Sequence, residues 1–399
     1  MDIRLDHKGT LENHSRDALI FRGPMDIPFL MITLLLLTIG VIMVLSASYA
    51  SAYFDIQRET GGNPTHYFTR QFVFAILGVV AMYLASRMPI AFFRKMALPV
   101  LLTALALMVL VLFIGEEVNG ARRWIMILGV SVQPSEIAKI AIILFFAKMI
   151  CHFKNDMGTF KCGVLPFGIV LVGMIVLLGF QPHLSAAVII IMIGAIMMFI
   201  GGTRLIWFGG GIVVVSALLA LSIAIFDHSP ARITSWLDPF SDPRGAGYQI
   251  IQSLLAVGSG GLFGLGLGQS RQKYLYLPEE HNDFIFAIVS EELGFIGATL
   301  ILILFALLII RGYWLALHTR DRYSFLVCAG ISSLLAIQVI LNVAVITNLI
   351  PSTGISLPFF SYGGTALLMQ MGKVGIILSI SRDIPVRKTV KPEKKAIKN

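Results

Sequence analysis

The sequence has 399 residues, of which 57% are hydrophobic and only 13% are charged. Because a soluble globular domain carries about 25% charged residues, this composition excludes an ordinary soluble fold. The net charge of +9 would suit a nucleic-acid-binding protein, but here the basic residues lie between long apolar runs, so we expect no nucleic-acid partner. Three cysteines without metal-ligand spacing indicate neither a disulfide framework nor a zinc site.

Long apolar runs predict the membrane-spanning helices. The runs cover residues 27–48, 71–87, 96–115, 133–151, 163–181, 184–202, 205–226, 284–310, 323–346 and 356–381. The first run is too long for the apolar part of a cleavable signal peptide, so we expect it to remain in the membrane. The chain is therefore predicted to be an all-α integral membrane protein with about ten transmembrane helices.

The distribution of lysine and arginine predicts the orientation. With a cytoplasmic N-terminus, 21 of these residues lie inside, eight lie outside and two lie within spans. This bias favours an N-in and C-in topology. It divides the chain into a cytoplasmic segment (1–25), a membrane domain (26–381) and a basic cytoplasmic tail (382–399) that faces the anionic inner leaflet.

A large extracytoplasmic loop, residues 227–283, is predicted between helices seven and eight. Its segment 249–268 is apolar enough to resemble another span, but it contains six glycines, which weaken a helix. A crossing there would also place the basic tail outside. We therefore predict that this segment is re-entrant or lies along the outer surface.

Basic residues gather at two places in the predicted outer loops. Arg122 and Arg123 lie in VNGARRWI, and Arg271 and Lys273 lie in GQSRQKYLYLPEEHNDF. One interpretation is a solvated loop that touches lipid headgroups. The other is a site for an anionic, membrane-borne substrate such as a lipid phosphate or pyrophosphate, because arginine donates hydrogen bonds to phosphate in pairs.

Asp283 lies where the long outer loop enters the eighth predicted helix, after Glu279, Glu280 and His281. It is a good helix N-cap residue, and it is also placed to act as a general base. Neighbouring carboxylates would raise its pKa, whereas the helix N-terminus and any nearby arginine would lower it. Both interpretations remain open from the sequence.

Several predicted spans contain ionisable residues, which usually face the interior of a bundle. Glu136 and Lys139 are three residues apart and share one helical face, either as an ion pair that fixes packing or as the wall of a polar cavity. Glu291, Glu292 and Lys373 add to this polar interior. A transporter would show the same feature.

The stretch PSTGISLPFFSYGGT, residues 351–365, is too rich in proline and glycine for a regular helix. Inside a membrane such backbone is tolerated only where it lines a cavity or is buried in protein. Its hydroxyl side chains, including Ser361, either hydrogen-bond a sugar or belong to a purely structural helix break.

These segments together resemble the SEDS family (shape, elongation, division and sporulation), and the resemblance covers nearly the whole chain. The motifs are NGARRWI (119–125), QPSEIAK (133–139), DPFSDPRGAGYQ (238–249), LPEEHNDFIFAIVSEELGFIGA (277–298) and ISLPFFSYGGT (355–365). The arginine pair in ARRW is closer to the division and sporulation branch than to the elongation branch. His183 and Asn282 depart from the family pattern, which has an acidic residue and a threonine at these positions.

The resemblance implies a multi-pass protein of the bacterial plasma membrane with peptidoglycan glycosyltransferase activity. Its substrate would be lipid II, polymerised at the outer leaflet into β-1,4-linked glycan with release of undecaprenyl pyrophosphate. The implied partners are a class B penicillin-binding protein and other membrane proteins of the divisome or elongasome. Mg²⁺ or Mn²⁺ is the expected ion, and no organic cofactor is expected.

The resemblance also implies roles for particular residues. Asp283 falls on the family's essential aspartate, and the expected substrate-binding residues are Arg122, Arg123, Glu136, Lys139, Lys273, His281 and Ser361. Two other functions compete with the enzyme. A lipid II flippase would explain the polar spans but not the gathering of charged motifs on one face. A non-catalytic membrane scaffold would not need Asp283.

Overall fold

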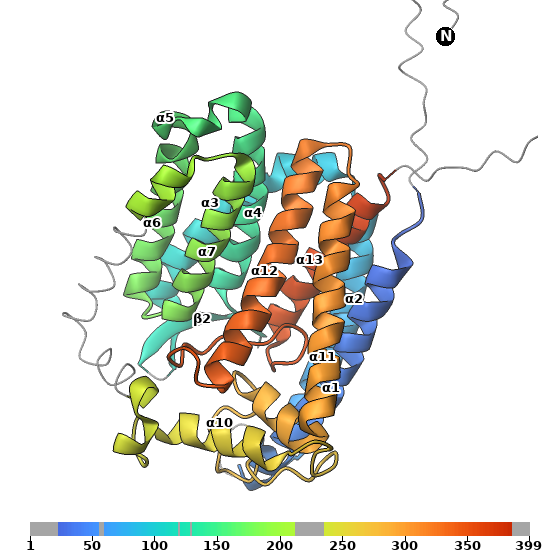
Figure 1. Ribbon diagram of the computed structural model, residues 1–399, viewed down its shortest axis with the longest axis vertical. Coiled ribbons are helices and arrows are strands. Elements are labelled where there is room, and N and C mark those ends of the chain that lie inside the picture. Colours follow the sequence, from blue (N-terminus) through green and yellow to red (C-terminus); the bar gives the residue numbers. More distant parts are fainter. Residues whose placement is uncertain (1–22, 56–59, 119, 128–129, 212–234, 385–399) are drawn as a thin grey trace, which may run out of the picture.

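The computed structural model describes residues 23–55, 60–118, 120–127, 130–211 and 235–384. Its long helices stand side by side in one bundle (Figure 1). The membrane-crossing candidates are α1 (Ile27–Phe54), α2 (His66–Arg87), α3 (Ile90–Ile114), α5 and α6 (Phe160–Gly163 and Leu165–Phe180), α7 (Leu184–Gly201), α11 (Ile285–Leu317), α12 (Arg322–Ile346) and α13 (Gly364–Ser381). The prediction of a helical integral membrane protein is confirmed.

A further helix in the bundle, α4 (Pro134–Phe153), is also long enough to cross a membrane, at about 1.5 Å per residue. It carries three charged residues, Glu136, Lys139 and Lys148, and therefore differs in composition from the other spans. The predicted seventh helix, 205–226, falls mostly outside the described residues, so the count of ten remains a prediction. The same holds for most of the two terminal segments.

Helix α12 is the central helix of the bundle. It packs against α4, α7, α11 and α13, and 78% of its apolar window is buried. By contrast, only 22% of the corresponding window is buried in α2 and in the α5–α6 span, whose apolar side chains face outward. This arrangement fits a bundle whose outer helices face lipid, because lipid chains are as apolar as the side chains that they meet.

Both ends of the membrane domain lie on one face of the bundle. The backbone N–H of Gly23 donates to the carbonyl of Arg382 at 2.8 Å, and the Arg311 guanidinium pairs with Asp26 at 2.6 Å. The two ends of the membrane domain therefore lie on the same side, as predicted. From the charge distribution, this is the cytoplasmic face, and we call the opposite face, which holds the start of α11, the outer face.

The outer loop predicted at 116–132 contains strands that the sequence analysis did not predict. Strands β1 (Glu116–Val118), β2 (Ala121–Ile127) and β3 (Val130–Val132) form an antiparallel sheet in the order β1-β2-β3. Gly120, with φ of 73°, lies in the reversal between the first two strands, where glycine has no steric penalty. The fold is thus helical with one small outer sheet.

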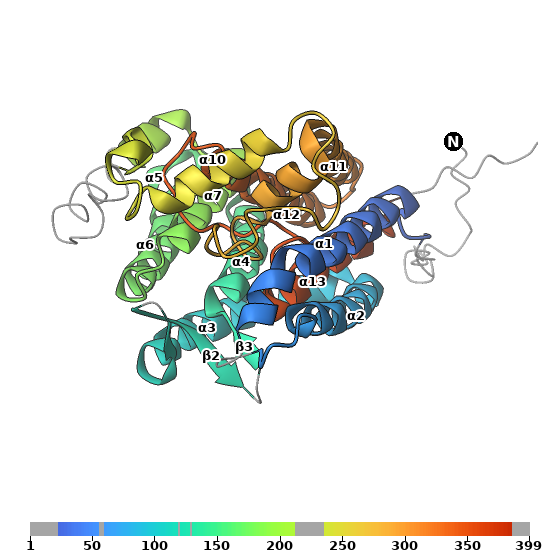
Figure 2. The same cartoon turned by 90° about the horizontal axis from the view of Figure 1, so that it is seen from below.

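The segment 249–268, predicted to be re-entrant or to lie along the outer surface, contains one short helix. Its helix α10 (Tyr248–Ser259), which follows the short η2 (Pro239–Ser241), has 12 residues, too few to span a bilayer. Figures 1 and 2 show it lying across the outer end of the bundle. It buries Ile250, Ile251 and Ala256 and is tied to α12 by the hydroxyl of Ser253, which donates to Ile346 O at 3.0 Å.

Helix α11 contains a break at Gly294, where φ is 68° and ψ is −172°. The loop after α10 fills the break. Backbone N–H groups on both sides donate across it: Leu265 to Glu291 O (3.0 Å), Gly266 to Glu292 O (3.0 Å), Phe295 to Gly261 O (2.8 Å) and Ile296 to Leu262 O (3.1 Å). The backbone groups released by the break are thus satisfied inside the protein, as membrane structure requires.

The last predicted span begins later than expected. We predicted a helix from residue 356, but α13 starts at Gly364, and residues 351–363 form a loop. Pro358 and the positive φ of Phe359, 67°, are incompatible with a helix there. This loop, which we call the 351–363 loop, packs into the outer end of the bundle, with Ile355, Leu357 and Phe360 buried.

Candidate active site

Asp283 lies on the outer face immediately before α11. The N-cap position of α11 is held by Phe284, and no side chain caps the helix. The capping role that the sequence allowed for Asp283 is therefore not seen. The first eight residues of α11, Ile285 to Glu292, are all buried, so the helix is anchored in the protein directly behind the aspartate.

The backbone around Asp283 is held in place at three consecutive carbonyls. The backbone N–H of Tyr362 donates to His281 O at 2.9 Å, and the Ser361 hydroxyl donates to Asn282 O at 2.7 Å. The carboxamide of Asn342, on α12, donates to Asp283 O at 2.9 Å and also to Ile355 O at 2.6 Å. The 351–363 loop and α12 therefore fix the position of the aspartate.

Ser361 acts in this geometry as a positioning residue. Its Oγ donates to Asn282 O and accepts from the backbone N–H of Leu357 at 2.7 Å. Both bonds are buried or nearly so, which leaves little capacity for a direct bond to a sugar. The predicted substrate role of Ser361 therefore remains a prediction, whereas its support of the aspartate is visible in the structure.

The carboxylate of Asp283 is half-buried, and burial together with the Glu279 carboxylate raises its pKa from 3.8 to about 6. Arg123 and His281 act in the opposite direction but do not cancel this effect. Gly354 lies beside it with φ of 68°, and a Cβ at Gly354 would come within 3.0 Å of Asp283 Oδ2. Only glycine leaves space at this edge of the carboxylate.

The two predicted arginines point to opposite faces of β2, as adjacent residues of a strand do. The Arg123 guanidinium donates to Gln181 O at 3.3 Å and to Pro182 O, and it is close enough to Asp283 to lower its pKa. Arg122 instead lies 3.6 Å from the carboxylate of Glu117, with 49% of its side chain exposed. The structure thus brings Arg123, but not Arg122, to the aspartate.

His183, which stands where the SEDS family has an acidic residue, lies at the start of α7 in the loop that Arg123 contacts. Its Nε2 is 3.4 Å from Gln133 Nε2, and its Nδ1 is buried with no hydrogen-bond partner in the described part of the chain. Burial and the charges of Arg123 and Lys139 lower its pKa to about 3. The imidazole is therefore neutral at physiological pH.

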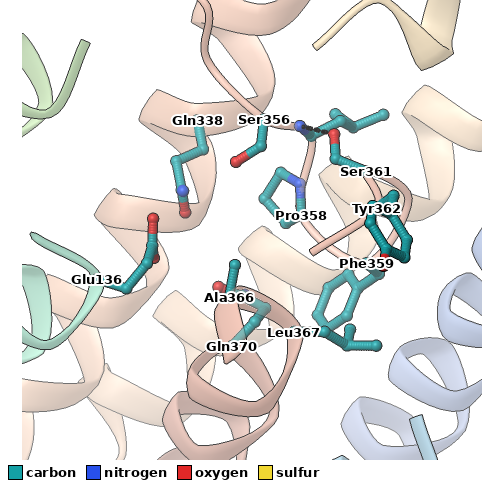
Figure 3. Close-up of a pocket in the computed structure, with 11 residues that line it drawn as sticks. Glu136, Gln338, Ser356, Pro358, Phe359, Ser361, Tyr362, Ala366, Leu367 and Gln370 are labelled. Carbon is teal, nitrogen blue, oxygen red and sulfur yellow. Dashed lines mark hydrogen bonds between the residues drawn. The ribbon is translucent and has the colours of Figure 1, made fainter. Parts of the chain in front are cut away.

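Glu136 and Lys139 form the interior ion pair that their spacing predicted. The Lys139 ammonium donates to Glu136 Oε1, and both side chains are over nine-tenths buried. Lys373, on α13, lies near the same carboxylate and is 1% exposed. Glu136 also lines a cavity beneath the 351–363 loop (Figure 3), so the pair and the cavity wall are two aspects of one arrangement.

Lys273 lies away from Asp283 in a different environment from the one predicted. Its ammonium is buried, 3.0 Å from Glu292 Oε1 and 2.6 Å from Gly268 O. This ion pair joins the outer loop to α11 beside the break at Gly294. The position does not favour the predicted contact with a pyrophosphate, since the lysine is neutralised and shielded from solvent.

His281 lies two residues before the aspartate, in an aromatic cluster. Its ring centroid is 4.5 Å from that of Tyr67 and 5.8 Å from that of Tyr362. Its Nδ1 lies 3.4 Å from Glu280 Oε1. The imidazole is thus oriented by neighbours on α2 and the 351–363 loop, and its predicted substrate contact remains a prediction.

A divalent ion is not favoured by the protein groups alone. No group of three or more His, Cys, Asp or Glu residues placed to hold a metal occurs in the part of the chain that the structure describes. Mg²⁺ often relies on one or two carboxylates plus substrate phosphates, so the predicted Mg²⁺ or Mn²⁺ remains a prediction.

Three residues of this site were not predicted from the sequence: Asn342, Gly354 and Ser185, whose hydroxyl donates to Thr353 O. Asn342 had a signal that could have been used. It is a polar residue in an otherwise apolar run near the outer end of a span, and such residues usually face the bundle interior. Gly354 and Ser185 gave no comparable signal, because their importance comes from packing between distant segments.

Comparison with known proteins places the chain in a family. The family model described as cell cycle protein, which covers FtsW, RodA and SpoVE, matches residues 27–384. Stage V sporulation protein E of Bacillus subtilis is 44% identical over 363 residues, 90% of this chain and 97% of the relative. A probable peptidoglycan glycosyltransferase FtsW of Trichlorobacter lovleyi is 39% identical over 358 residues, 89% of this chain and 93% of the relative.

Solved structures agree with these relatives. A chain of a peptidoglycan synthase complex that coordinates polymerisation and crosslinking superposes with a TM-score of 0.74 at 26% identity, covering 90% of this chain and 98% of that chain. The rod shape determining protein RodA of Thermus thermophilus superposes with a TM-score of 0.65 at 25% identity, covering 90% and 97%. The chain therefore belongs to the FtsW, RodA and SpoVE family of multi-pass bacterial membrane proteins.

Proposed function

We propose that this protein is a peptidoglycan glycosyltransferase that polymerises lipid II at the outer leaflet. The observation that carries the proposal is Asp283, a half-buried carboxylate on the outer face whose pKa is raised to about 6. A general base works best when its pKa lies near the working pH. The names of the relatives, which include several probable peptidoglycan glycosyltransferases, support the same activity.

In the proposed reaction, Asp283 removes the proton from the C4 hydroxyl of N-acetylglucosamine on one lipid II chain. The oxygen attacks C1 of N-acetylmuramic acid on a second chain, where the bond to undecaprenyl pyrophosphate breaks. The new bond is β-1,4 because attack from the opposite side inverts C1. General base catalysis of this type contributes about 10²–10⁴-fold to the rate.

The leaving pyrophosphate needs cationic partners as its charge develops. Arg123 is best placed, since it lies near Asp283 on the same face, and Arg122 offers a more exposed guanidinium on the other side of β2. Entry from the outer leaflet would leave the lipid tail in the membrane. Extracting the tail into water would cost about 0.8 kcal/mol per CH₂ group, and this cost is avoided. We further propose a class B penicillin-binding protein as partner, because the solved relative functions in a complex that also crosslinks.

The proposal is tested by polymerisation of fluorescent lipid II with purified protein, with and without the penicillin-binding partner. Wild type should form glycan ladders and Asp283→Asn should form none. Asp55→Asn is a matched control, because Asp55 is another half-buried carboxylate near the outer end of α1 and should leave polymerisation unchanged. The value of log kcat/KM should rise with pH and level off above about 6, where Asp283 is ionised.

Ladders from Asp283→Asn at wild-type rate would refute the assignment of the base. If neither protein formed glycan even with partner and Mn²⁺, the glycosyltransferase proposal would fail. Movement of lipid II between leaflets of vesicles containing the protein would then favour the flippase. Full complementation of a depleted strain by the Asp283→Ala variant would favour the scaffold.

A further inference from the structure

A small cavity lies beneath the 351–363 loop. Its walls include Glu136, Gln338, Ser356, Ser361 and Gln370, which come from α4, α12, α13 and the loop (Figure 3). Gln370 lies in the second turn of α13, and Gln338 lies about two turns from the outer end of α12. The cavity is thus in the outer half of the bundle.

The two glutamines of this cavity have no hydrogen-bond partner in the part of the chain that the structure describes. Gln338 is 3% exposed and Gln370 is 4% exposed, yet neither carboxamide forms a hydrogen bond with any described residue, and Gln338 Oε1 and Gln370 Nε2 are completely buried. Buried amides are nearly always satisfied, because an unpaired one loses its bonds to water without replacement. Two such groups on one cavity indicate a ligand that forms the missing hydrogen bonds with both carboxamides.

The charges around the cavity restrict the ligand. An anion would meet the Glu136 carboxylate on the cavity wall. A cation would face Lys139, which is paired with that carboxylate, and Lys373, which lies close to it. A neutral polar group avoids both kinds of repulsion and suits the two carboxamides.

The hydrogen-bonding pattern of the two carboxamides restricts the chemical class of the ligand further. Each carboxamide supplies an N–H donor and a carbonyl acceptor, so the pair complements a group that itself has one N–H and one C=O. This match holds whichever way the glutamine amides are turned. The remaining walls, which include Leu357, Pro358, Ala366 and Leu367, are apolar and suit a methyl group. An acetamido group, CH₃–CO–NH–, has all of these features.

We propose that this cavity is the subsite for the 2-acetamido group of the N-acetylglucosamine whose 4-hydroxyl reaches Asp283. The inference rests on the proposed function. One loop connects the two places, since Gly354 lies against Asp283 Oδ2 and Ser356 and Ser361 line the cavity. The acetamido group and the 4-hydroxyl stand on the same sugar ring, so binding of the first would position the second for proton removal.

The test compares natural lipid II with an analogue in which glucose replaces N-acetylglucosamine and N-acetylmuramic acid is retained. The analogue keeps the reacting C4 hydroxyl and the leaving group but has no acetamido group on the acceptor sugar. Wild type with its penicillin-binding partner should show a kcat/KM for the analogue lower by about tenfold or more, because two buried amides lose their partners.

Gln338→Leu and Gln370→Leu should lower kcat/KM for natural lipid II and remove the preference between the two substrates. Since neither glutamine has a hydrogen-bond partner among the described residues, the melting temperature of both variants should equal or exceed that of wild type. Gln272→Leu is a matched control, because its Oε1 is also buried and unpaired but it lies on the outer loop away from the cavity. This control should keep the full preference.

Equal rates of wild type on both substrates would overturn the subsite while leaving the proposed function intact, and this comparison needs no variant to fold. A preference retained in both leucine variants would also overturn it. Absence of any glycan from wild type and natural lipid II would instead count against the proposed function and, with it, the subsite.

Discussion

Replacing Asp283 with asparagine should stabilise the protein while it removes activity. The pKa of Asp283 is raised from 3.8 to about 6, so the ionised carboxylate is less favourable in the folded protein than in the unfolded chain. Each factor of ten in the proton affinity corresponds to about 1.36 kcal/mol. The variant should therefore be more stable than wild type by at most about 3 kcal/mol at pH 8. Water at the exposed edge of this half-buried side chain reduces the effect, and we expect about 2 kcal/mol.

The difference in stability between Asp283→Asn and wild type depends on pH. Below about pH 4 the carboxyl group is protonated in both states and contributes nothing to the difference. Between about pH 4 and pH 6 the folded protein binds the extra proton, so the stability of wild type falls relative to the variant as pH rises. Above about pH 6 the difference is constant and at its largest.

The measurement is the midpoint of thermal unfolding in detergent for both proteins from pH 5 to pH 8. Asp283→Asn should melt higher than wild type, by an amount that grows up to about pH 6 and then remains level. Asp55→Asn, which removes a half-buried carboxylate outside the site, is measured in parallel as the control. A variant that is less stable than wild type at pH 8 would refute the reasoning, because it would mean that the charged carboxylate makes favourable contacts in the folded state.

Three other substitutions test the supports of the site. Lys139→Met should cost about 3–5 kcal/mol of stability, and the double variant Glu136→Gln/Lys139→Met should cost less, because a lone buried charge is the expensive state; equal melting temperatures would contradict the ion pair. Lys273→Met should destabilise in the same way and Lys273→Met/Glu292→Leu should recover, as measured by thermal unfolding. Gly294→Ala should cost at least about 1–3 kcal/mol, because φ is 68° there and a Cβ would lie 2.2 Å from Gly264 N, whereas Gly258→Ala in α10 should be neutral or stabilising.

The sequence predicted the helices well because each span must bury an apolar run of a fixed length in lipid. From charge and glycine content alone it also predicted that both ends of the membrane domain lie on one face, as they do, and that residues 249–268 do not cross the membrane, where the structure has only the short helix α10. It missed the β1–β2–β3 sheet, since strands of three and seven residues in a loop have too weak a pattern to separate from turns. It also started α13 too early, because apolar residues of the 351–363 loop are buried without being helical.

Individual charged residues were harder to assign than helices. Glu136 and Lys139 could be paired from the sequence because the helical repeat fixes their relative position. Arg122 and Arg123 looked equivalent, and only the strand geometry of β2 separates them. Lys273 looked like a free outer cation, but its partner Glu292 comes from another element, and contacts of this kind between distant segments are not encoded in any local pattern.

The segments around Asp283 hold its carboxylate where the pKa is raised. A carboxylate held where its charge is disfavoured would tend to turn toward water, which would return its pKa to the ordinary range. Hydrogen bonds to the carbonyls of His281, Asn282 and Asp283 restrain the backbone against this movement, and Gly354 provides the space in which the carboxylate lies. The donors come from α12 and the 351–363 loop, and the same loop also lines the cavity that Gln338 and Gln370 border. Because the 351–363 loop both holds the base and forms a wall of the proposed acetamido subsite, it would bring the sugar hydroxyl and the carboxylate together. A substitution that shifts this loop should therefore impair both binding of the acetamido group and proton removal in the same variant.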